Sequence, residues 1–447
     1  MRVLALVDGE HYPPTTRWGL ATARALGYEV AAAIFVGGME KVAADGSVDL
    51  GAVAVERVSG DPAVFLREAI ARHSVEAVVD LSDEPVLGYR ERMLYASAAL
   101  AAGVRYEASD MRLEPPVDGP PIDAATLAVI GTGKRTGKTA VAGEAARAIA
   151  EAGMEPVLVA MGRGGPAAPV IARAGSIDLE HLVRLVQAGE HAASDYLEDA
   201  ITTGVTTIGA RRCGGGIAGR PFVSNVRAAA ELAAQELRSK EQGVVILEGS
   251  GAAVPPVPWD AGVLVCRAGA PEESLAGYMG PYRVLRSDLV VFTMGASPDI
   301  GPSPTTLISH VRRLNPAART VATDFVPVPL GDVEGKTVFF ATTAPSAAGP
   351  TLSSKLEESS GCSVVGVTHS LGDRAALARE IDGAPAFDVL VTELKAAAVD
   401  VAAERASARG AEVVFSDNRP VTIEGDGEVK DLLVETARLA MERAEGR

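Results

Sequence analysis

The sequence predicts an α/β protein of three Rossmann-like modules, each a parallel sheet covered by helices. Short apolar runs alternate with alanine-rich helical stretches along the chain, which is the pattern of parallel sheets with helices packed on them. At 447 residues the chain is too long for a single hydrophobic core. Since domains of about 150 residues are the norm, length and alternation together favour about three domains.

Two segments rich in proline and glycine divide the chain. Residues 114–121 read EPPVDGPP and predict a linker, and residues 329–336, PLGDVEGK, form a second candidate boundary. We therefore expect an N-terminal α/β domain over 1–122, a central domain over 123–332 and a C-terminal α/β domain over 333–447.

The apolar runs are the expected strands of each module. In the N-terminal module they span 2–8, 29–37 and 76–83. In the central module they span 126–131, 155–162, 243–249, 261–268 and 287–294. In the C-terminal module they span 336–345, 363–370, 388–394 and 412–418.

Composition and charge argue against several partners and metal sites. The net charge of −16 disfavours binding to nucleic acid or anionic membranes, because both attract a basic face. Cys213, Cys266 and Cys362 are odd in number and far apart, so neither a disulfide framework nor a zinc site is expected, and a reducing cytoplasm is the expected compartment. The first residues do not resemble a signal peptide, and no run of about 18 apolar residues predicts a membrane span.

The stretch GTGKRTGKT, residues 131–139, has the composition of a phosphate-binding loop. It follows the apolar run TLAVI and precedes a strong helix former that ends at Gly153. In this order the N–H groups of the turn and of the first helical turn converge where the helix dipole favours an anion. The expected nucleotide-binding residues are Gly131, Thr132, Gly133, Lys134, Arg135, Thr136, Gly137, Lys138, Thr139 and Ala140.

The loop departs from the usual P-loop pattern because Thr132 stands where a glycine is expected. The form GT, four residues, GKT resembles the loops of dethiobiotin synthetase and related ATP-dependent ligases, which share a P-loop class with MinD-type ATPases. MinD-type loops carry a second lysine five residues before the P-loop lysine, whereas Lys134 lies four before Lys138. We therefore assign Lys134 no cross-dimer role; a phosphate contact within its own loop and a solvated lysine remain equal alternatives.

A metal site is expected between the loop and a strand-end carboxylate. Lys138 is expected to contact the β- and γ-phosphates, and Thr139 to offer its hydroxyl to Mg²⁺. Glu248 ends an apolar run and precedes Gly-Ser-Gly, which resembles the EGAGG segment of dethiobiotin synthetase, whose glutamate is a metal ligand. The alternative is an ordinary strand-end carboxylate. No Asn-Lys-x-Asp sequence for guanine recognition occurs, so ATP is the expected nucleotide.

Arginines in two glycine-rich loops predict an anionic substrate. A guanidinium binds phosphate oxygens with two donors, and neighbouring glycines let the ligand approach closely. One loop, MGRGGP, follows a central strand, and the other reads GARRCGGGIAGR. The candidate residues are Arg163, Arg211, Arg212 and Arg220, although any one of them could be a surface salt-bridge partner.

The N-terminal module offers a second candidate site in VDGEHYPPTTRWG. A strand there ends in Asp8, and a polar turn precedes a helix. Ligands bind at the carboxyl ends of strands in open α/β sheets, so His11, Tyr12 and Arg17 are candidate substrate ligands. A capping turn with a structural histidine is the alternative.

Six segments in this order resemble the cyclic 2,3-diphosphoglycerate synthetase family over essentially the whole chain: VDGEHYPP, GTGKRTGKTAV, MGRGGP, GARRCGGGIAG, LEGSGAA and FATTAP. The resemblance implies a cytoplasmic enzyme that uses ATP and Mg²⁺ to close 2,3-diphosphoglycerate into a cyclic pyrophosphate, with release of ADP and phosphate. Phosphorylation of 2-phosphoglycerate, help from K⁺ and a homodimer are further expectations.

In that reaction Lys138, Arg163 and Glu248 are the expected catalytic residues, and the N-terminal domain is expected to cover the substrate through His11 and Arg17. Three alternatives remain open. The chain could be another ligase of the dethiobiotin synthetase type that acts on a carboxylate, a nucleotide-driven switch, or a regulator that has lost activity. The arginine loops weigh against the first, the position of Lys134 against the second, and the intact Gly-Lys-Thr against the third.

Overall fold

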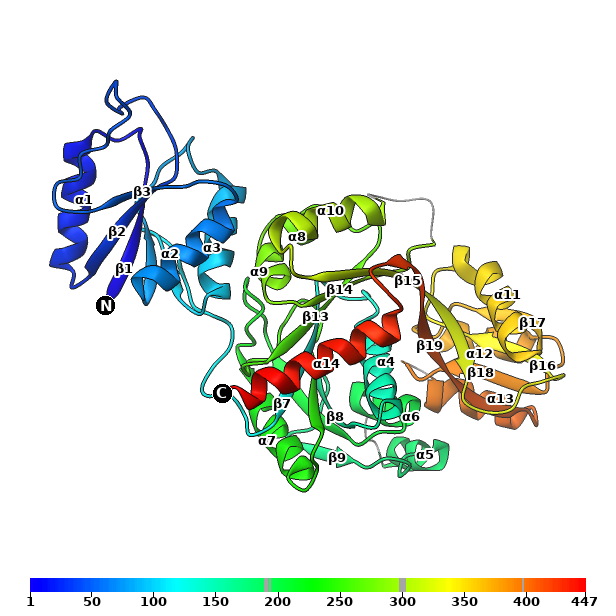
Figure 1. Cartoon of the computed structure of the whole chain (residues 1–447). Coiled ribbons are helices and arrows are strands. Elements are labelled where there is room, and N and C mark those ends of the chain that lie inside the picture. The colour runs from blue at the N-terminus through cyan, green and yellow to red at the C-terminus, as the bar shows by residue number, and fades with distance from the viewer. Residues whose placement is uncertain (189–191, 193, 297–302, 396–397) are drawn as a thin grey trace.

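The computed structural model describes residues 1–188, 192, 194–296, 303–395 and 398–447. It confirms an α/β protein whose strands form two sheets, one of six strands and one of thirteen. The N-terminal sheet stands apart at one side of the molecule, and a single chain segment leads from it into the larger body (Figure 1). In the described part of the chain, no helix has the length and apolar character needed to cross a membrane.

The N-terminal sheet has the strand order β3-β2-β1-β4-β5-β6 and is parallel except for the pair of β5 and β6. Its buried strands confirm the predicted apolar runs, while the short strands β3, β5 and β6 were not predicted. The strands are β1 (Arg2–Val7), β2 (Glu29–Phe35), β3 (Val55–Arg57), β4 (Ala77–Asp80), β5 (Arg105–Glu107) and β6 (Arg112–Leu113). The helices are α1 (Pro13–Ala25), α2 (Pro62–His73) and α3 (Tyr89–Ala101).

The central part of the large sheet has the order β10-β8-β12-β7-β13-β14-β15, with every neighbouring pair parallel. Two short strands pair antiparallel with β10 at its edge. The strands are β7 (Ala125–Gly131), β8 (Glu155–Gly162), β9 (Val170–Ala172), β10 (Thr207–Cys213), β11 (Val223–Ser224), β12 (Gly243–Glu248), β13 (Ala261–Arg267), β14 (Leu289–Thr293) and β15 (Arg319–Pro329).

The same sheet continues into the C-terminal part in the order β15-β19-β18-β16-β17. The antiparallel pairing of β15 with β19 places Phe325 opposite Pro420 and joins the two parallel halves. The strands are β16 (Thr337–Ala341), β17 (Ser363–Thr368), β18 (Val389–Glu393) and β19 (Glu412–Gly425). Two of the three predicted modules therefore share one sheet, which alternating apolar runs could not reveal.

Helices cover both faces of the central strands and bury two separate apolar clusters. One cluster lies under α7 (Val226–Leu237), α8 (Glu273–Ala276), α9 (Gly280–Leu285) and α10 (Pro304–Leu314). The other lies under α4 (Lys138–Glu151) and the last helix, α14 (Val429–Glu445). The remaining helices are α5 (Leu179–Gln187), α6 (Asp195–Thr203), α11 (Gly349–Ser360), α12 (Arg374–Gly383), α13 (Glu404–Ala408), a 3₁₀ turn at Ser346–Ala348 and a π-helix at Ala398–Ala403.

Helix α14 leaves the C-terminal strands and returns across the central body beside α4, as the red ribbon in Figure 1 shows. Leu432, Leu433 and Ala437 are fully or nearly fully buried there. The last helix of the predicted unit 333–447 thus shares the core of the central strands. The domain limits 1–122, 123–332 and 333–447 themselves stay predictions.

Candidate active site

The predicted phosphate-binding loop joins strand β7 to helix α4. Strand β7 ends at Gly131 and α4 begins at Lys138, with Gly137 as its N-cap in the left-handed region at φ 82°. No side chain caps the helix. Because the first N–H groups of a helix lack intrahelical partners, this uncapped end is available to an anion.

Two glycines of the loop are required by close contacts. A Cβ on Gly137 would lie 2.5 Å from Cζ of Phe325 on β15, and the positive φ adds backbone strain for any other residue. A Cβ on Gly131 would lie 2.7 Å from Cδ of Lys138. The loop is therefore packed between its own lysine and the strand that leads to the C-terminal part.

Lys138 is 8% exposed, and its Nζ donates a hydrogen bond to the backbone oxygen of Gly133 at 2.8 Å. Burial lowers the pKa of Lys138 to about 8, with the carboxylates of Glu248 and Asp195 opposing the shift. Lys134 is exposed, and its side chain forms no hydrogen bond or ion pair within the described ranges. Of the two lysines, only the side chain of Lys138 is buried.

Glu248 lies at the end of β12, directly beside α4, the helix that follows the phosphate-binding loop. The Thr139 hydroxyl donates to Oε1 of Glu248 at 2.8 Å. The carboxyl is 4% exposed, and burial together with the charge of Asp195 raises the pKa of Glu248 to about 7. The two predicted metal ligands are thus neighbours in space.

Helix α6 adds three acidic residues to this region. Asp195, Glu198 and Asp199 occupy positions i, i+3 and i+4, which lie on one helix face. Asp199 is 0% exposed, and neither of its carboxylate oxygens accepts a hydrogen bond from a donor among the described residues. Burial and the neighbouring carboxylate of Glu248 raise the pKa of Asp199 well above its usual value.

The segment that forms this acidic face carries only a weak signal in the sequence. The segment ASDYLEDA fits a solvated helix face as well as a buried one, because the spacing alone does not say which way the face points. What identifies the face is its contact with Glu248, which lies on a strand far away in the sequence.

These side chains suit Mg²⁺ better than a metal that needs a complete protein cage. Across the described ranges, no group of three or more His, Cys, Asp and Glu side chains is arranged to hold a metal ion. Mg²⁺ usually takes one or two carboxylates and completes its shell with phosphate oxygens and water. The Thr139 hydroxyl, Glu248 and the donor-free carboxylate of Asp199 offer such a partial set of oxygens.

Two of the four predicted arginines lie against the loop that follows Glu248. Arg212 donates through Nη2 to the backbone oxygen of Ser250 at 2.8 Å. A Cβ on Gly251 would lie 2.7 Å from Nη2 of Arg163, so the absence of a side chain there lets this guanidinium approach. Both positive charges are close enough to help lower the pKa of Lys138.

The other two arginines lie elsewhere. Arg220 pairs with Asp118 of the segment that links the N-terminal sheet to β7. Arg211 directly precedes Arg212 on β10, so its exposed side chain points to the opposite face of the strand. The structure therefore groups Arg163 and Arg212 with Lys138, and leaves Arg211 and Arg220 outside this group.

The N-terminal candidates form a separate group at the end of β1. Asp8 is buried and accepts hydrogen bonds from the backbone of Glu10, His11 and Asp83, while Nδ1 of His11 lies 2.9 Å from its Oδ1. Arg17 pairs with a carboxylate of its own domain at 2.8 Å, and Tyr12 is exposed. Within the described residues, no hydrogen bond or ion pair joins His11, Tyr12 or Arg17 to the central strands.

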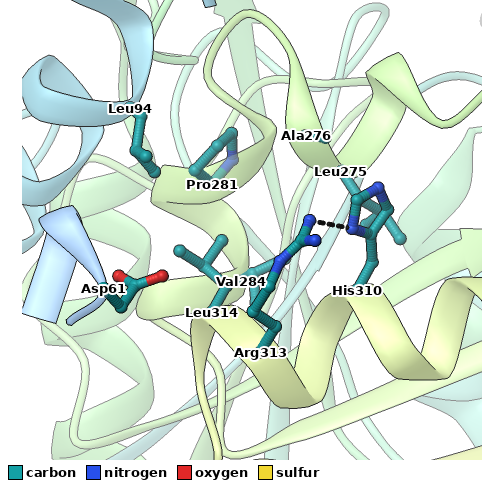
Figure 2. Close-up of a pocket in the computed structure, with 9 residues that line it drawn as sticks. All are labelled: Asp61, Leu94, Leu275, Ala276, Pro281, Val284, His310, Arg313 and Leu314. Atoms are coloured by element: carbon teal, nitrogen blue, oxygen red, sulfur yellow. Dashed lines mark hydrogen bonds between the residues drawn. The ribbon is translucent and has the colours of Figure 1, made fainter. Parts of the chain in front are cut away.

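A small cavity of about 90 Å³ lies between the N-terminal domain and the helices of the central body. Figure 2 shows Leu94 of α3 and Asp61, the N-cap of α2, facing Pro281 and Val284 of α9, with His310 and Arg313 on α10. None of the predicted site residues lines it. The cavity is thus a feature of domain packing rather than of the phosphate-binding loop.

Comparison with known proteins confirms the resemblance drawn from the motifs. Sequence profiles of cyclic 2,3-diphosphoglycerate synthetase match residues 2–114 for its N-terminal domain, 126–324 for its P-loop domain and 329–419 for its C-terminal domain. The cyclic 2,3-diphosphoglycerate synthetase of Rubrobacter xylanophilus is 46% identical, covering 100% of this chain and 98% of that protein. Those of Methanothermobacter thermautotrophicus and Methanothermus fervidus are 39% and 38% identical, covering 98% and 99% of this chain and 96% and 98% of theirs.

Proposed function

This chain belongs to the cyclic 2,3-diphosphoglycerate synthetase family, and on that premise we propose that it uses ATP to cyclise 2,3-diphosphoglycerate. ATP phosphorylates one phosphate of the substrate and leaves as ADP. The second phosphate then attacks the first within the same molecule, a new P–O–P bond forms, and inorganic phosphate leaves. The product is the cyclic pyrophosphate.

The observation that carries this proposal is the meeting of an uncapped helix N-terminus with three cationic groups. Lys138 lies in the loop, and Arg163 and Arg212 lie against the loop that follows Glu248. Two substrate phosphates repel each other and must be brought together, which requires positive charge on both. A ligase that acts on a carboxylate would need fewer cations at this place.

The chain contributes orientation and charge more than proton transfer. Because the attacking phosphate is already ionised, no general base is needed. Because the attack is intramolecular, alignment of the two phosphates is the main contribution of the protein, and two guanidinium groups with planar donor forks suit that task. We assign Lys138 to the transferring phosphoryl group, and Arg163 and Arg212 to the substrate phosphates.

Thr139 and Glu248 would hold a magnesium ion, with Asp199 as a further oxygen donor. When bound, Mg²⁺ neutralises charge on the transferring phosphoryl group. The chain's own part is to bring the charge of Lys138 close to Glu248, which favours the ionised carboxylate against the burial that raises its pKa.

The remaining assignments stay predictions from the sequence and from the family resemblance. They comprise substrate contacts of Arg211, Arg220, His11, Tyr12 and Arg17, nucleotide contacts of residues 131–140, phosphorylation of 2-phosphoglycerate, help from K⁺, a cytoplasmic location and a homodimer. Closure of the N-terminal domain over the substrate through His11 and Arg17 belongs to the same group, since Arg17 would first have to leave its present carboxylate partner.

Phosphorus NMR tests the proposed function directly. The protein is incubated with ATP, Mg²⁺ and either 2,3-diphosphoglycerate or 2-phosphoglycerate, and the cyclic pyrophosphate, ADP and phosphate are followed together. The proposal requires one cyclic product for each ATP consumed from 2,3-diphosphoglycerate. ATP consumption without a cyclic product would contradict it, and a doubly phosphorylated product from 2-phosphoglycerate would establish the kinase step.

A further inference from the structure

Arg283 on α9 is a buried cation without an acidic partner. It is 6% exposed and forms no salt bridge within the part of the chain that the structure describes. Nη1 donates to the backbone oxygen of Met279 at 2.9 Å, and Nη2 to that of Ala252 at 2.6 Å. Its Nε has no hydrogen-bond partner there. An unpaired buried charge costs stability, so a purely structural purpose does not account for it.

The Ala252 carbonyl belongs to the glycine loop that follows Glu248. In this loop Ser250 accepts a hydrogen bond from Arg212, and Gly251 makes room for Arg163. Arg283 also lies beneath the second glycine loop, because a Cβ on Gly219 would be 3.1 Å from its Nη2. One guanidinium therefore touches the loop that Arg163 and Arg212 contact, and also the loop that carries Arg212.

The other side of α9 faces the N-terminal domain. Met93 and Leu100 of α3 share a buried cluster with Met279 and Tyr282 around α9, and with Ala218 of the second glycine loop. Figure 2 shows Leu94 of α3 across the cavity from Pro281 and Val284 of α9. The N-terminal domain is thus packed against the helix that supports the loops.

We propose that Arg283 is a positioning residue that fixes the two glycine loops and so places Arg163 and Arg212 for the substrate phosphates, with α9 transmitting the docking of the N-terminal domain. This rests on the proposed function. Arginine suits the role because its planar fork can hold two carbonyls with fixed geometry, whereas lysine is a point donor. Its charge, which no carboxylate neutralises, also adds to the positive field offered to the substrate.

The test replaces Arg283 and separates substrate binding from nucleotide binding. Arg283→Met should lower kcat/KM for 2,3-diphosphoglycerate by about 10- to 100-fold, the effect of losing hydrogen bonds to a charged group. The dissociation constant of ADP should change by less than about twofold, because no contact of Arg283 reaches residues 131–139. Arg283→Lys should recover part of the loss by retaining the charge and one carbonyl contact.

Arg286→Met is the matched control. Arg286 follows α9 directly, lies over the Trp259 ring at 4.7 Å and touches neither glycine loop. It should leave both constants within about twofold. If Arg283→Met and Arg286→Met behave alike, or if Arg283→Met weakens ADP and 2,3-diphosphoglycerate equally, the positioning role is wrong. Calorimetric binding of both ligands is measured beside turnover, so a wild-type protein that binds both without cyclising contradicts the proposed function alone.

Discussion

The carboxyl edges of the N-terminal sheet and of the central sheet use the same strand-end geometry but treat their charges differently. At the N-terminal edge, Asp8 accepts three backbone hydrogen bonds and contacts His11, and Asp80 is held by Arg92. At the central edge, Lys138 has a lowered pKa and Asp199 has no donor among the described residues. Charged groups stabilise the first edge and cost stability at the second.

This difference in how the two edges hold their charges indicates which of them is the active site. Both edges satisfy the rule that ligands bind at strand ends in open sheets, so position alone does not separate them. Perturbed pKa values from burial together with specific charged neighbours mark a functional site. At the central edge these occur in Lys138, Glu248 and Asp199. At the N-terminal edge the carboxylates are paired within the domain, and the raised pKa values there belong to the buried tyrosines Tyr95 and Tyr106. Four variants test this contrast.

The largest expected effect is loss of turnover in Lys138→Ala. Removing the cation that contacts the transferring phosphoryl group should lower kcat by about 10³-fold or more. The melting temperature should not fall, because burial of Lys138 opposes its charged form. Turnover by phosphorus NMR and thermal unfolding give the two readings. Lys134→Ala is the control and should lose less than about tenfold; equal losses in both variants would overturn the ranking of the lysines.

Arg92→Met should act in the opposite way, on stability rather than chemistry. Its Nη1 donates to the buried carboxylate of Asp80 at 2.6 Å, and its Nη2 to the Ser82 backbone oxygen at 3.0 Å. Asp80 would keep its hydrogen bonds from Ser82 and Tyr106 but lose its cation, and a buried carboxylate without a cation should cost about 3 kcal/mol. Hydrogen exchange should rise in residues 2–113 and not around residues 131–139.

Arg90→Met is the control for that variant. Arg90 pairs with Glu273 on the surface, where the two side chains are 51% and 42% exposed. Such exposed pairs contribute about 0–1 kcal/mol, so hydrogen exchange should hardly change. If Arg92→Met left exchange unaltered, the N-terminal edge would not be held by its internal ion pairs, and the contrast between the two edges would fail.

Asp199→Asn should stabilise the ligand-free protein, by about 1 kcal/mol or about 2–4 °C in Tm. The folded-state pKa of Asp199 is raised above 3.8, so between that value and the folded pKa the native state binds more protons than the unfolded state. Wild-type stability therefore falls as pH rises through this window. Asparagine lacks this dependence, so its advantage should grow from pH 4 to pH 8. If Asp199→Asn were no more stable than the wild type, or if the gain did not depend on pH, the ionised carboxylate of Asp199 would not destabilise the folded protein.

The smallest expected effect is that of His11→Ala. If His11 contacts the substrate, its removal should raise KM for 2,3-diphosphoglycerate by about threefold, the value of one modest hydrogen bond. The KM for ATP should stay unchanged, which steady-state kinetics with each substrate varied in turn will show. An unchanged KM for both would make the turn at Asp8 purely structural, and a loss comparable to that of Lys138→Ala would place the N-terminal edge in the chemistry.

Sequence reasoning located the phosphate-binding loop because all its parts are local. The strand, the glycine turn and the helix that begins at Lys138 are consecutive in the chain, and their order alone defines the anion site. Glu248 was also found, since its strand and the glycines after it carry a recognisable pattern. Asp199 and Arg283 were not identified as site residues. Asp and Arg side chains lie mostly at the protein surface, so neither an acidic helix face nor an arginine between apolar residues indicates burial.

By itself the sequence determined the α/β class, the loop at 131–139 and the family. The alternation of apolar runs with helical stretches, and the motifs and their order, can be read directly along the chain. Only the tertiary structure decided that β15 and β19 join two modules into one sheet, and that α14 returns to the central strands. It also decided that Arg163 and Arg212, but not Arg220, lie beside Lys138. These outcomes depend on which distant segments share one interior, and burial there sets the energy of each charge.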